Sequence, residues 1–189
     1  MTNRKRKITI LFDKVIATPI YFMLLLFYRP RKEVIRNNSI HRILLIRPGG
    51  IGDFLLNVPA FKELRKKFPK AEITIFLFNR NKDCIELYND FNNIIIIDNL
   101  KEFFFFLLKN KNYDLCIDFD QHRKIPSIIS ILSKAKVKIG FNNSLKGKAY
   151  NYPVQYNPDE YEAQSFLNLL KPININKELK EQDLILNSS

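Results

Sequence analysis

Apolar positions from residue 42 onward follow two alternating patterns. Short unbroken apolar runs, such as "ILLI" at 43–46 and "IIII" at 94–97, are typical of strands that are covered on both faces. Between these runs, apolar residues recur every three or four positions, which is the spacing of a helix with one buried face. The patterns predict strands at 42–48, 71–78, 92–98, 113–120 and 136–141, and helices at 52–68, 82–90, 100–111, 124–135 and 159–173.

The order of these elements predicts the fold class. Strands that alternate with helices through short connections indicate an α/β, Rossmann-like, doubly wound parallel sheet with helices on both faces. Residues 142–159 are rich in Asn, Lys and Tyr and predict a loop before the last helix. We therefore expect one sheet domain at residues 41–175, followed by the start of a linker or tail at 176–189.

The N-terminal segment, residues 1–40, has a different pattern. Apolar residues between Ile8 and Ile16 follow helical spacing, which predicts an amphipathic helix, and the run that follows is apolar on all sides. The stretch without a charge, Val15 to Tyr28, has 14 residues. As a helix it measures roughly 21 Å, which is shorter than a bilayer core of about 30 Å.

Charge is concentrated in the same segment. Lys and Arg number 31 against 19 acidic residues, a net charge of +12. Residues 1–36 hold nine basic and two acidic residues, so they carry +7 of it. Basic clusters flank the apolar run, and we expect residues 4–32 to lie in a membrane interface. The alternatives are a helix packed on the protein's own core, a spanning helix and a signal peptide. Nucleic acid is not an expected partner, because the basic excess flanks an apolar helix.

The clearest candidate for chemistry is the turn "RPGGIGD", residues 47–53. In a doubly wound sheet, ligands bind outside the carboxyl ends of the strands. Glycines between a strand and a helix let a phosphate or sugar approach the backbone closely, although the spacing fits neither GxGxxG nor a P-loop. Alternatively, the glycines only make a tight connection, and Asp53 only stabilises the helix N-terminus by about 0.3–1 kcal/mol.

Two further pairs of residues have simpler interpretations. Asp118 and Asp120 follow a predicted strand, and we assign them to solvation or helix capping. Cys84 and Cys116 lie in apolar segments and are expected to be buried free thiols. No Cys/His cluster suggests a metal site.

The stretch "ILLIRPGGIGDFLLNVPAFKELRKKFPKAEITIF" closely resembles the opening of the family 9 glycosyltransferases, the lipopolysaccharide heptosyltransferase family. The matching positions are Ile51-Gly52-Asp53, Leu55-Leu56, Pro59-Ala60 and Leu64. Later in the chain, "YDLCIDFDQHRK" resembles the family's "YDLVIDLQG" strand end, and "KVKIGF" resembles its "AKxRIGF" strand. The resemblance covers roughly residues 41–175.

The resemblance implies the N-terminal, acceptor-binding half of a GT-B fold. It implies that Asp53 is the general base of an inverting sugar transfer, without a metal or another cofactor. It also implies a nucleotide-sugar donor, an anionic glycolipid acceptor and a place at the inner face of a bacterial cytoplasmic membrane. The residues expected to bind substrate are Arg47, Gly49, Gly50, Gly52, Arg80, His122, Arg123 and Lys124, although each cation could instead be solvated at the surface.

The family's donor-binding motif, similar to "DSGxxHLAxA", does not occur in this sequence. We therefore expect this chain alone to lack the donor pocket. A truncated gene product, a fragment and half of a split enzyme all fit the sequence. The alternative function is a non-catalytic remnant that binds glycans at the membrane.

Overall fold

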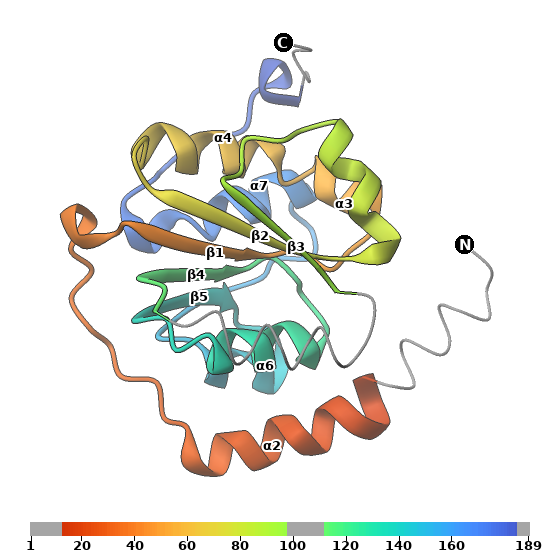
Figure 1. Ribbon diagram of the computed structural model, residues 1–189, viewed down its shortest axis with the longest axis vertical. Coiled ribbons are helices and arrows are strands. Elements are labelled where there is room, and N and C mark those ends of the chain that lie inside the picture. The colour runs from red at the N-terminus through yellow and green to blue at the C-terminus, as the bar shows by residue number, and fades with distance from the viewer. Residues whose placement is uncertain (1–12, 98–111, 185–189) are drawn as a thin grey trace.

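The computed structural model describes residues 13–97 and 112–184, which include a six-stranded sheet (Figure 1). The strand order is β3-β2-β1-β4-β5-β6, and every pair of neighbours is parallel. The predicted Rossmann-like α/β fold is therefore confirmed. The strands are β1 Arg42–Ile46, β2 Glu72–Phe78, β3 Asn93–Ile97, β4 Leu115–Asp118, β5 Val137–Phe141 and β6 Tyr152–Val154.

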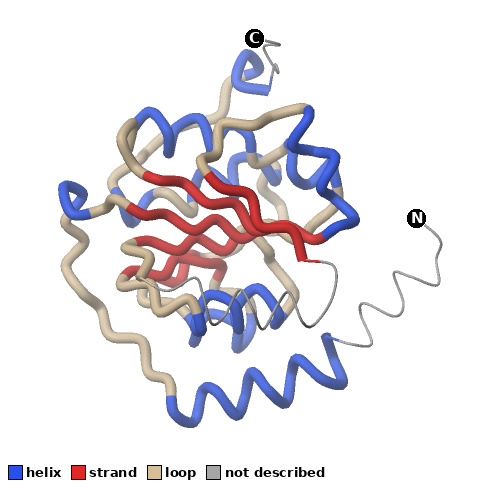
Figure 2. Tube along the Cα trace, in the orientation of Figure 1, coloured by secondary structure: helices blue, strands red, loops and turns tan. Residues whose placement is uncertain are grey.

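Helices cover both faces of the sheet (Figure 2). α3, α4 and α7 pack on one face, α6 packs on the other, and α2 lies outside α6 (Figure 1). The α-helices are α2 Thr18–Phe27, α3 Ile51–Leu55, α4 Val58–Lys67, α6 Lys124–Leu132 and α7 Glu162–Asn168. A π-helix, η1 Asp13–Ala17, precedes α2, and the 3₁₀ helices are η2 Asn37–Ser39, η3 Asn79–Glu86, η4 Ser144–Ala149, η5 Lys171–Ile173 and η6 Glu181–Leu184.

The central strand β1 shows why the strands have unbroken apolar sequences. Ile43 and Leu45 point to the core under α3, α4 and α7, whereas Leu44 and Ile46 point to the core under α6. All four side chains are fully buried. Because both faces are covered, period-2 alternation of polar and apolar residues is absent, as expected for a parallel sheet. Both cysteines are buried and free, as predicted.

The single helix predicted at 52–68 is wrong, because the structure divides it into α3 and α4. The break lies at Leu56 and Asn57, and Pro59 occupies the first turn of the second helix. Proline has no N–H and its ring clashes with the carbonyl four residues earlier, so it starts a helix more readily than it continues one. The division leaves Asp53 on a short helix that starts directly at the carboxyl end of β1.

The loop predicted at 142–159 is also wrong, because it contains η4 and a sixth strand, β6. β6 has three residues, pairs only with β5 and includes Pro153. Proline is tolerated at a sheet edge because it need not donate a ladder hydrogen bond there. Such a short edge strand has too few positions to show a pattern.

Two more predicted helices have different outcomes. The segment 82–90 was predicted as an α-helix, but the structure has the 3₁₀ helix η3, which begins and ends earlier. The backbone dihedral angles of η3 depart from helical values at Asn81, whose side chain accepts the Phe78 N–H at 3.0 Å. The helix predicted at 100–111 lies outside the described residues.

α2 packs on the protein along one side. Tyr21 is fully buried between α2, α6 and η4, and its hydroxyl donates to the carbonyls of Leu145 and Lys146 at 2.9 and 3.1 Å. The opposite side of α2 is open, with Leu26 and Phe27 75% and 88% exposed. One side of α2 therefore packs on the protein's own core, which was one of the alternatives for the N-terminal segment. The other side of the helix remains an exposed apolar surface. None of the helices in the described residues combines the length and apolarity needed to span a bilayer.

A close contact between β5 and Tyr150 leads to the first testable prediction. A Cβ added at Gly140 would lie 2.4–2.7 Å from atoms of the Tyr150 ring. That ring is 2% exposed, and its hydroxyl hydrogen-bonds Asp118 and lies 2.9 Å from the Ser127 hydroxyl, so it has little room to move. We expect Gly140→Ala to lower the free energy of unfolding by about 1–3 kcal/mol, measured by urea denaturation.

Gly52→Ala is the matched control for this substitution. Nothing lies within 4 Å of a Cβ at Gly52, which is in α3 and has an ordinary negative φ. Alanine there restricts the unfolded chain and should raise stability by about 0.4–1 kcal/mol. Equal unfolding midpoints for the two variants would contradict the packing described for β5.

Candidate active site

The candidate site lies where the strand order reverses. β1 and β4 are neighbours at the centre of the sheet, and from them the chain builds outward in opposite directions. The loops that follow β1 and β4 therefore diverge at their carboxyl ends, which is where doubly wound folds bind ligands. Residues 47–53 leave β1 at this point, and residues 119–124 leave β4 beside them.

Asp53 lies in the first turn of α3, and its side chain is 50% exposed. Its Oδ2 accepts the backbone N–H of Gly50 at 2.8 Å and lies 3.8 Å from a terminal nitrogen of Arg47. These two contacts fix the carboxylate at the start of the helix. Because both use Oδ2, Oδ1 is the oxygen that can accept a proton from a substrate hydroxyl.

Arg47 lies beneath this carboxylate and is only 2% exposed. Its guanidinium donates to the carbonyl of Phe119 at 2.7 Å and lies over the Phe166 ring, 4.9 Å from the centroid. Burial lowers the pKa of Arg47, and the nearby carboxylates of Asp120 and Asp53 oppose that effect. Arg47 thus joins the loop after β1 to the loop after β4 and places a positive charge beside Asp53.

The three glycines of the turn have different surroundings. A Cβ at Gly49 would lie 2.7 Å from Asp53 Oδ2 and 3.1 Å from Arg47 Cζ, so a side chain there would displace the ion pair. Gly50 and Gly52 are exposed, and neither would meet a clash. No described glycine has a positive φ, so backbone conformation requires none of the three glycines, and space requires one only at Gly49.

Arg123 connects the second loop to the glycine turn. Its NH1 donates to the Pro48 carbonyl at 3.0 Å and lies 3.8 Å from Asp120 Oδ2. The neighbouring His122 is exposed, with Nδ1 3.2 Å from the Asn143 side-chain nitrogen. Arg123 therefore lies next to the turn that carries Asp53, and His122 extends the same edge toward the end of β5.

The other two cations predicted as substrate-binding are Lys124 and Arg80. Lys124 starts α6, and its ammonium lies 5.5 Å from the centre of the Tyr21 ring on α2, so it is directed toward the N-terminal helix. Arg80 belongs to η3, after β2, and its side chain is outside the described part of the chain. Its neighbour Asn81 is buried and donates to the Arg47 carbonyl at 3.0 Å.

A buried polar cluster supports the second loop from below. Lys146 is fully buried, with its ammonium 3.0 Å from Asp118 Oδ2 and 3.6 Å from Asp120 Oδ1. Asp120 Oδ1 also accepts the backbone N–H groups of His122 and Arg123, at 2.8 and 2.6 Å. Solvation is wrong for both aspartates, which are at most 5% exposed. Helix capping is wrong as well, because the N–H groups that Asp120 accepts belong to residues before α6, and the N-cap of that helix has no side-chain hydrogen bond.

The charges of this cluster follow from burial and from the nearby ammonium. Burial alone would raise the pKa of Asp120, but attraction to Lys146 and Arg123 lowers that pKa to about 2. Burial raises the pKa of Asp118, and Lys146 opposes the increase. Lys146 comes from a segment predicted as a loop, so no sequence pattern pointed to its role. In the described ranges, no three His, Cys, Asp or Glu side chains are grouped to hold a metal ion.

Comparisons with known proteins match this fold. No family model and no curated protein matches the sequence. Among solved structures, the E. coli heptosyltransferase WaaC with ADP-2-deoxy-2-fluoro heptose is 16% identical, with a TM-score of 0.61, over 77% of this chain and 52% of that one. A family 9 glycosyl transferase from Veillonella parvula is also 16% identical, with a TM-score of 0.62, over 76% and 44%.

A third structure, E. coli ADP-heptose lps heptosyltransferase II, is 14% identical, with a TM-score of 0.56, over 68% of this chain and 39% of that one. The chain thus spans about half or less of the length of these structures. The matches lie in the N-terminal portion of those chains, so the predicted N-terminal half of a GT-B fold is confirmed.

Proposed function

We propose that this chain is the acceptor-binding half of a glycosyltransferase, which transfers a sugar from a nucleotide-sugar donor to a cell-envelope glycan. The observation that carries the proposal is the half-exposed carboxylate of Asp53 at the point where the strand order reverses, fixed by Gly50 and Arg47. The fold shared with structures described as holding ADP or an ADP-heptose analogue supports the donor class. We place the donor contacts on a second domain outside these residues.

Asp53 serves as the general base in this proposal. The acceptor hydroxyl attacks the anomeric carbon while the bond from that carbon to the diphosphate oxygen breaks, and the hydroxyl proton passes to Asp53 Oδ1. A base must lie within hydrogen-bond reach of the proton that it removes. The contacts to Oδ2 hold the carboxylate in one orientation before substrate arrives, which reduces the reorganisation needed at the moment of reaction.

The charges beside Asp53 support an anionic acceptor. Arg123 and His122 border the glycine turn on the side of β4 and β5. A guanidinium has five N–H donors, so the bond from Arg123 to Pro48 leaves donors for a phosphate or carboxylate. Exposed Gly50 and Gly52 leave room for a sugar beside the helix start. A phosphorylated core oligosaccharide of lipopolysaccharide is the acceptor class that we propose.

Transfer of labelled heptose from ADP-heptose to a lipopolysaccharide-core acceptor tests the proposal, in an assay that supplies a donor-binding domain together with this chain. Transfer that depends on Asp53 is the expected result. Saturable binding of the acceptor without any transfer would instead favour the non-catalytic glycan-binding domain.

We further propose that the domain works at the inner face of a bacterial cytoplasmic membrane. The open side of α2 supports this location, because Leu26 and Phe27 project from a helix that is already fixed to the domain through Tyr21. Short helices with such a face lie in the interfacial region, with their apolar side buried about 5–10 Å. Basic residues after α2, Arg29 and Arg31 among them, favour anionic headgroups.

Vesicle flotation tests the membrane contact without removing α2. The double variant Leu26→Ser/Phe27→Ser should reduce partitioning into vesicles of phosphatidylglycerol and phosphatidylcholine about tenfold or more, because two apolar side chains no longer enter the bilayer. Val34→Ser is the control, since Val34 is 84% exposed but lies outside the helix. Equal flotation of the wild type and the double variant would refute the contact.

A further inference from the structure

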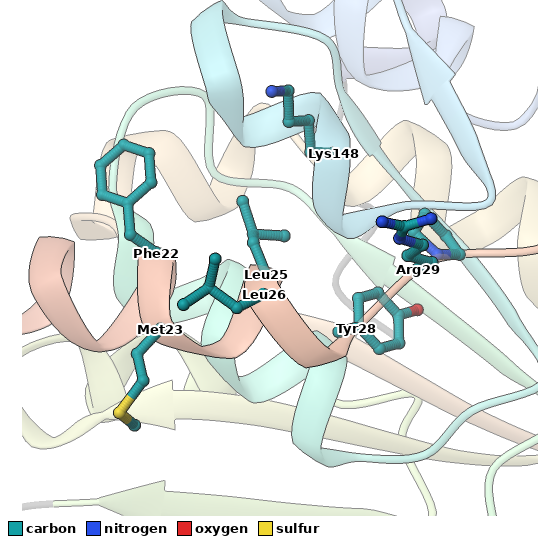
Figure 3. A pocket seen from close by; sticks show the side chains of 8 residues that line it. Phe22, Met23, Leu25, Leu26, Tyr28, Arg29 and Lys148 are labelled. Carbon is teal, nitrogen blue, oxygen red and sulfur yellow. The ribbon is translucent and has the colours of Figure 1, made fainter.

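A groove lies between the C-terminal half of α2 and η4 (Figure 3). Its volume is about 690 Å³, and most of its lining is apolar or aromatic, including Phe22, Leu25 and Leu26. The volume falls within the range of about 300–1,000 Å³ that is typical of small-molecule sites. The groove is separate from the site around Asp53, because it lies on the α6 side of the sheet.

Two cations come to the groove from different parts of the chain. Arg29 follows the end of α2, and Lys148 comes from η4 (Figure 3). Among the described residues, the lining of the groove includes these two cations and no carboxylate. An apolar groove with cations and without an opposing acid is complementary to a molecule with an apolar chain and an anionic head.

The two walls of the groove, α2 and η4, are fastened together by buried contacts. The buried Tyr21 hydroxyl on α2 donates to the carbonyls of Leu145 and Lys146 in η4. Lys146 is in turn fixed by Asp118 at 3.0 Å, and Ala149 packs in the same core as Tyr21. The groove is therefore part of the folded domain rather than a gap beside a loosely attached helix.

We propose that this groove binds one molecule of an anionic phospholipid. The phosphate lies between Arg29 and Lys148, and an acyl chain covers Leu25 and Leu26. The inference rests on the membrane location proposed above and adds a discrete lipid site to it. A soluble phosphate would engage only the cations and would leave the apolar lining uncovered, whereas a lipid in the bilayer satisfies both.

A titration with a short-chain lipid tests this site directly. Dihexanoylphosphatidylglycerol, used below its micelle concentration in 150 mM salt, is added to the full chain and followed by calorimetry. We expect saturable binding of one lipid per chain, and at least tenfold weaker binding of the Arg29→Gln/Lys148→Gln variant, which loses both charge-assisted hydrogen bonds. Leu26→Ser should also weaken binding, because it removes part of the apolar lining.

The matched control is Arg31→Gln/Lys32→Gln. This pair removes the same charge from the same neighbourhood, but neither residue lines the groove. Because 150 mM salt screens the attraction between the lipid phosphate and cations that do not contact it, we expect the dissociation constant of the control variant to stay within about twofold of the wild-type value. Equal losses in both double variants would overturn the proposal in favour of a diffuse basic surface.

Three other outcomes would also overturn it: absence of saturable binding, equal affinity for dihexanoylphosphatidylcholine, and displacement of the lipid by millimolar inorganic phosphate. The last result would mean that the cations form a soluble-phosphate site. The titration involves no sugar transfer. A failed transfer assay would therefore leave the lipid result standing, and a failed titration would leave the role of Asp53 untouched.

Discussion

Replacing Asp53 with asparagine should lower kcat for sugar transfer by about 10²–10⁴-fold, the usual contribution of a positioned general base. The amide oxygen of asparagine can still accept the Gly50 N–H, so the start of α3 should keep its geometry. The amide cannot take the proton of the acceptor hydroxyl. KM for the acceptor should therefore change little, and steady-state kinetics in the presence of a donor-binding domain separates the two parameters.

Asp83→Asn provides the control for this experiment. Asp83 is an exposed aspartate of η3, and its loss should leave kcat within about twofold of the wild type. If Asp53→Asn turned over as fast as Asp83→Asn, Asp53 would only stabilise the helix N-terminus, which is the simpler interpretation of its position.

Replacing Lys146 with methionine should have the largest effect on stability, a loss of about 3–5 kcal/mol in the free energy of unfolding. Lys146 is fully buried and neutralises Asp118 and Asp120, which are buried too. Methionine fills similar space but removes the ammonium that the two buried carboxylates share. Urea denaturation at neutral pH measures the loss.

Lys148→Met is the control, because Lys148 lies two residues further along η4 and is exposed. We expect its free energy of unfolding to stay within about 0.5 kcal/mol of the wild type. A similar value for Lys146→Met would show that the buried ion pairs contribute nothing to the fold.

The pH dependence of the Lys146 variant gives a second readout. In the wild type the folded pKa of Asp120 is lowered to about 2, below the value near 3.9 of an unfolded chain. The unfolded state therefore binds a proton more readily, and the stability due to Asp120 is complete above about pH 4 and lost as the pH falls toward 2. The Lys146→Met variant loses the part of this stability that comes from the Lys146 ammonium, while Arg123 and Arg47 still act on Asp120. The difference in the free energy of unfolding between the variant and the wild type should therefore become smaller as the pH falls from about 4 to about 2.

The sheet and the position of Asp53 could be predicted because they depend on local sequence. β1 is covered on both faces, so its apolar residues form one unbroken run that marks a strand. A residue a few positions after such a strand must lie at its carboxyl end, and Asp53 and Arg123 both follow predicted strands. Neither inference requires knowledge of a distant partner.

Other features depend on contacts between distant residues and could not be predicted. The burial of Arg47 results from its bond to the Phe119 carbonyl, 72 positions away. Lys146 acts through Asp118 and Asp120, which lie on a different loop, and its own sequence, "SLKGKA", has no regular pattern. Likewise, the position of Lys124 after β4 predicted a substrate-binding cation, but its ammonium lies over the ring of Tyr21 on α2.

The most direct test of the central claim is an NMR titration of the ¹⁵N-labelled chain, first with a phosphorylated core oligosaccharide of lipopolysaccharide and then with ADP-heptose. If this domain binds the acceptor, the oligosaccharide should produce saturable shifts of the amides of Gly50, Gly52, Asp53 and Arg123, and ADP-heptose should leave them unchanged. Shifts of the same amides with ADP-heptose but not with the oligosaccharide would contradict the account, because the domain would then bind the donor.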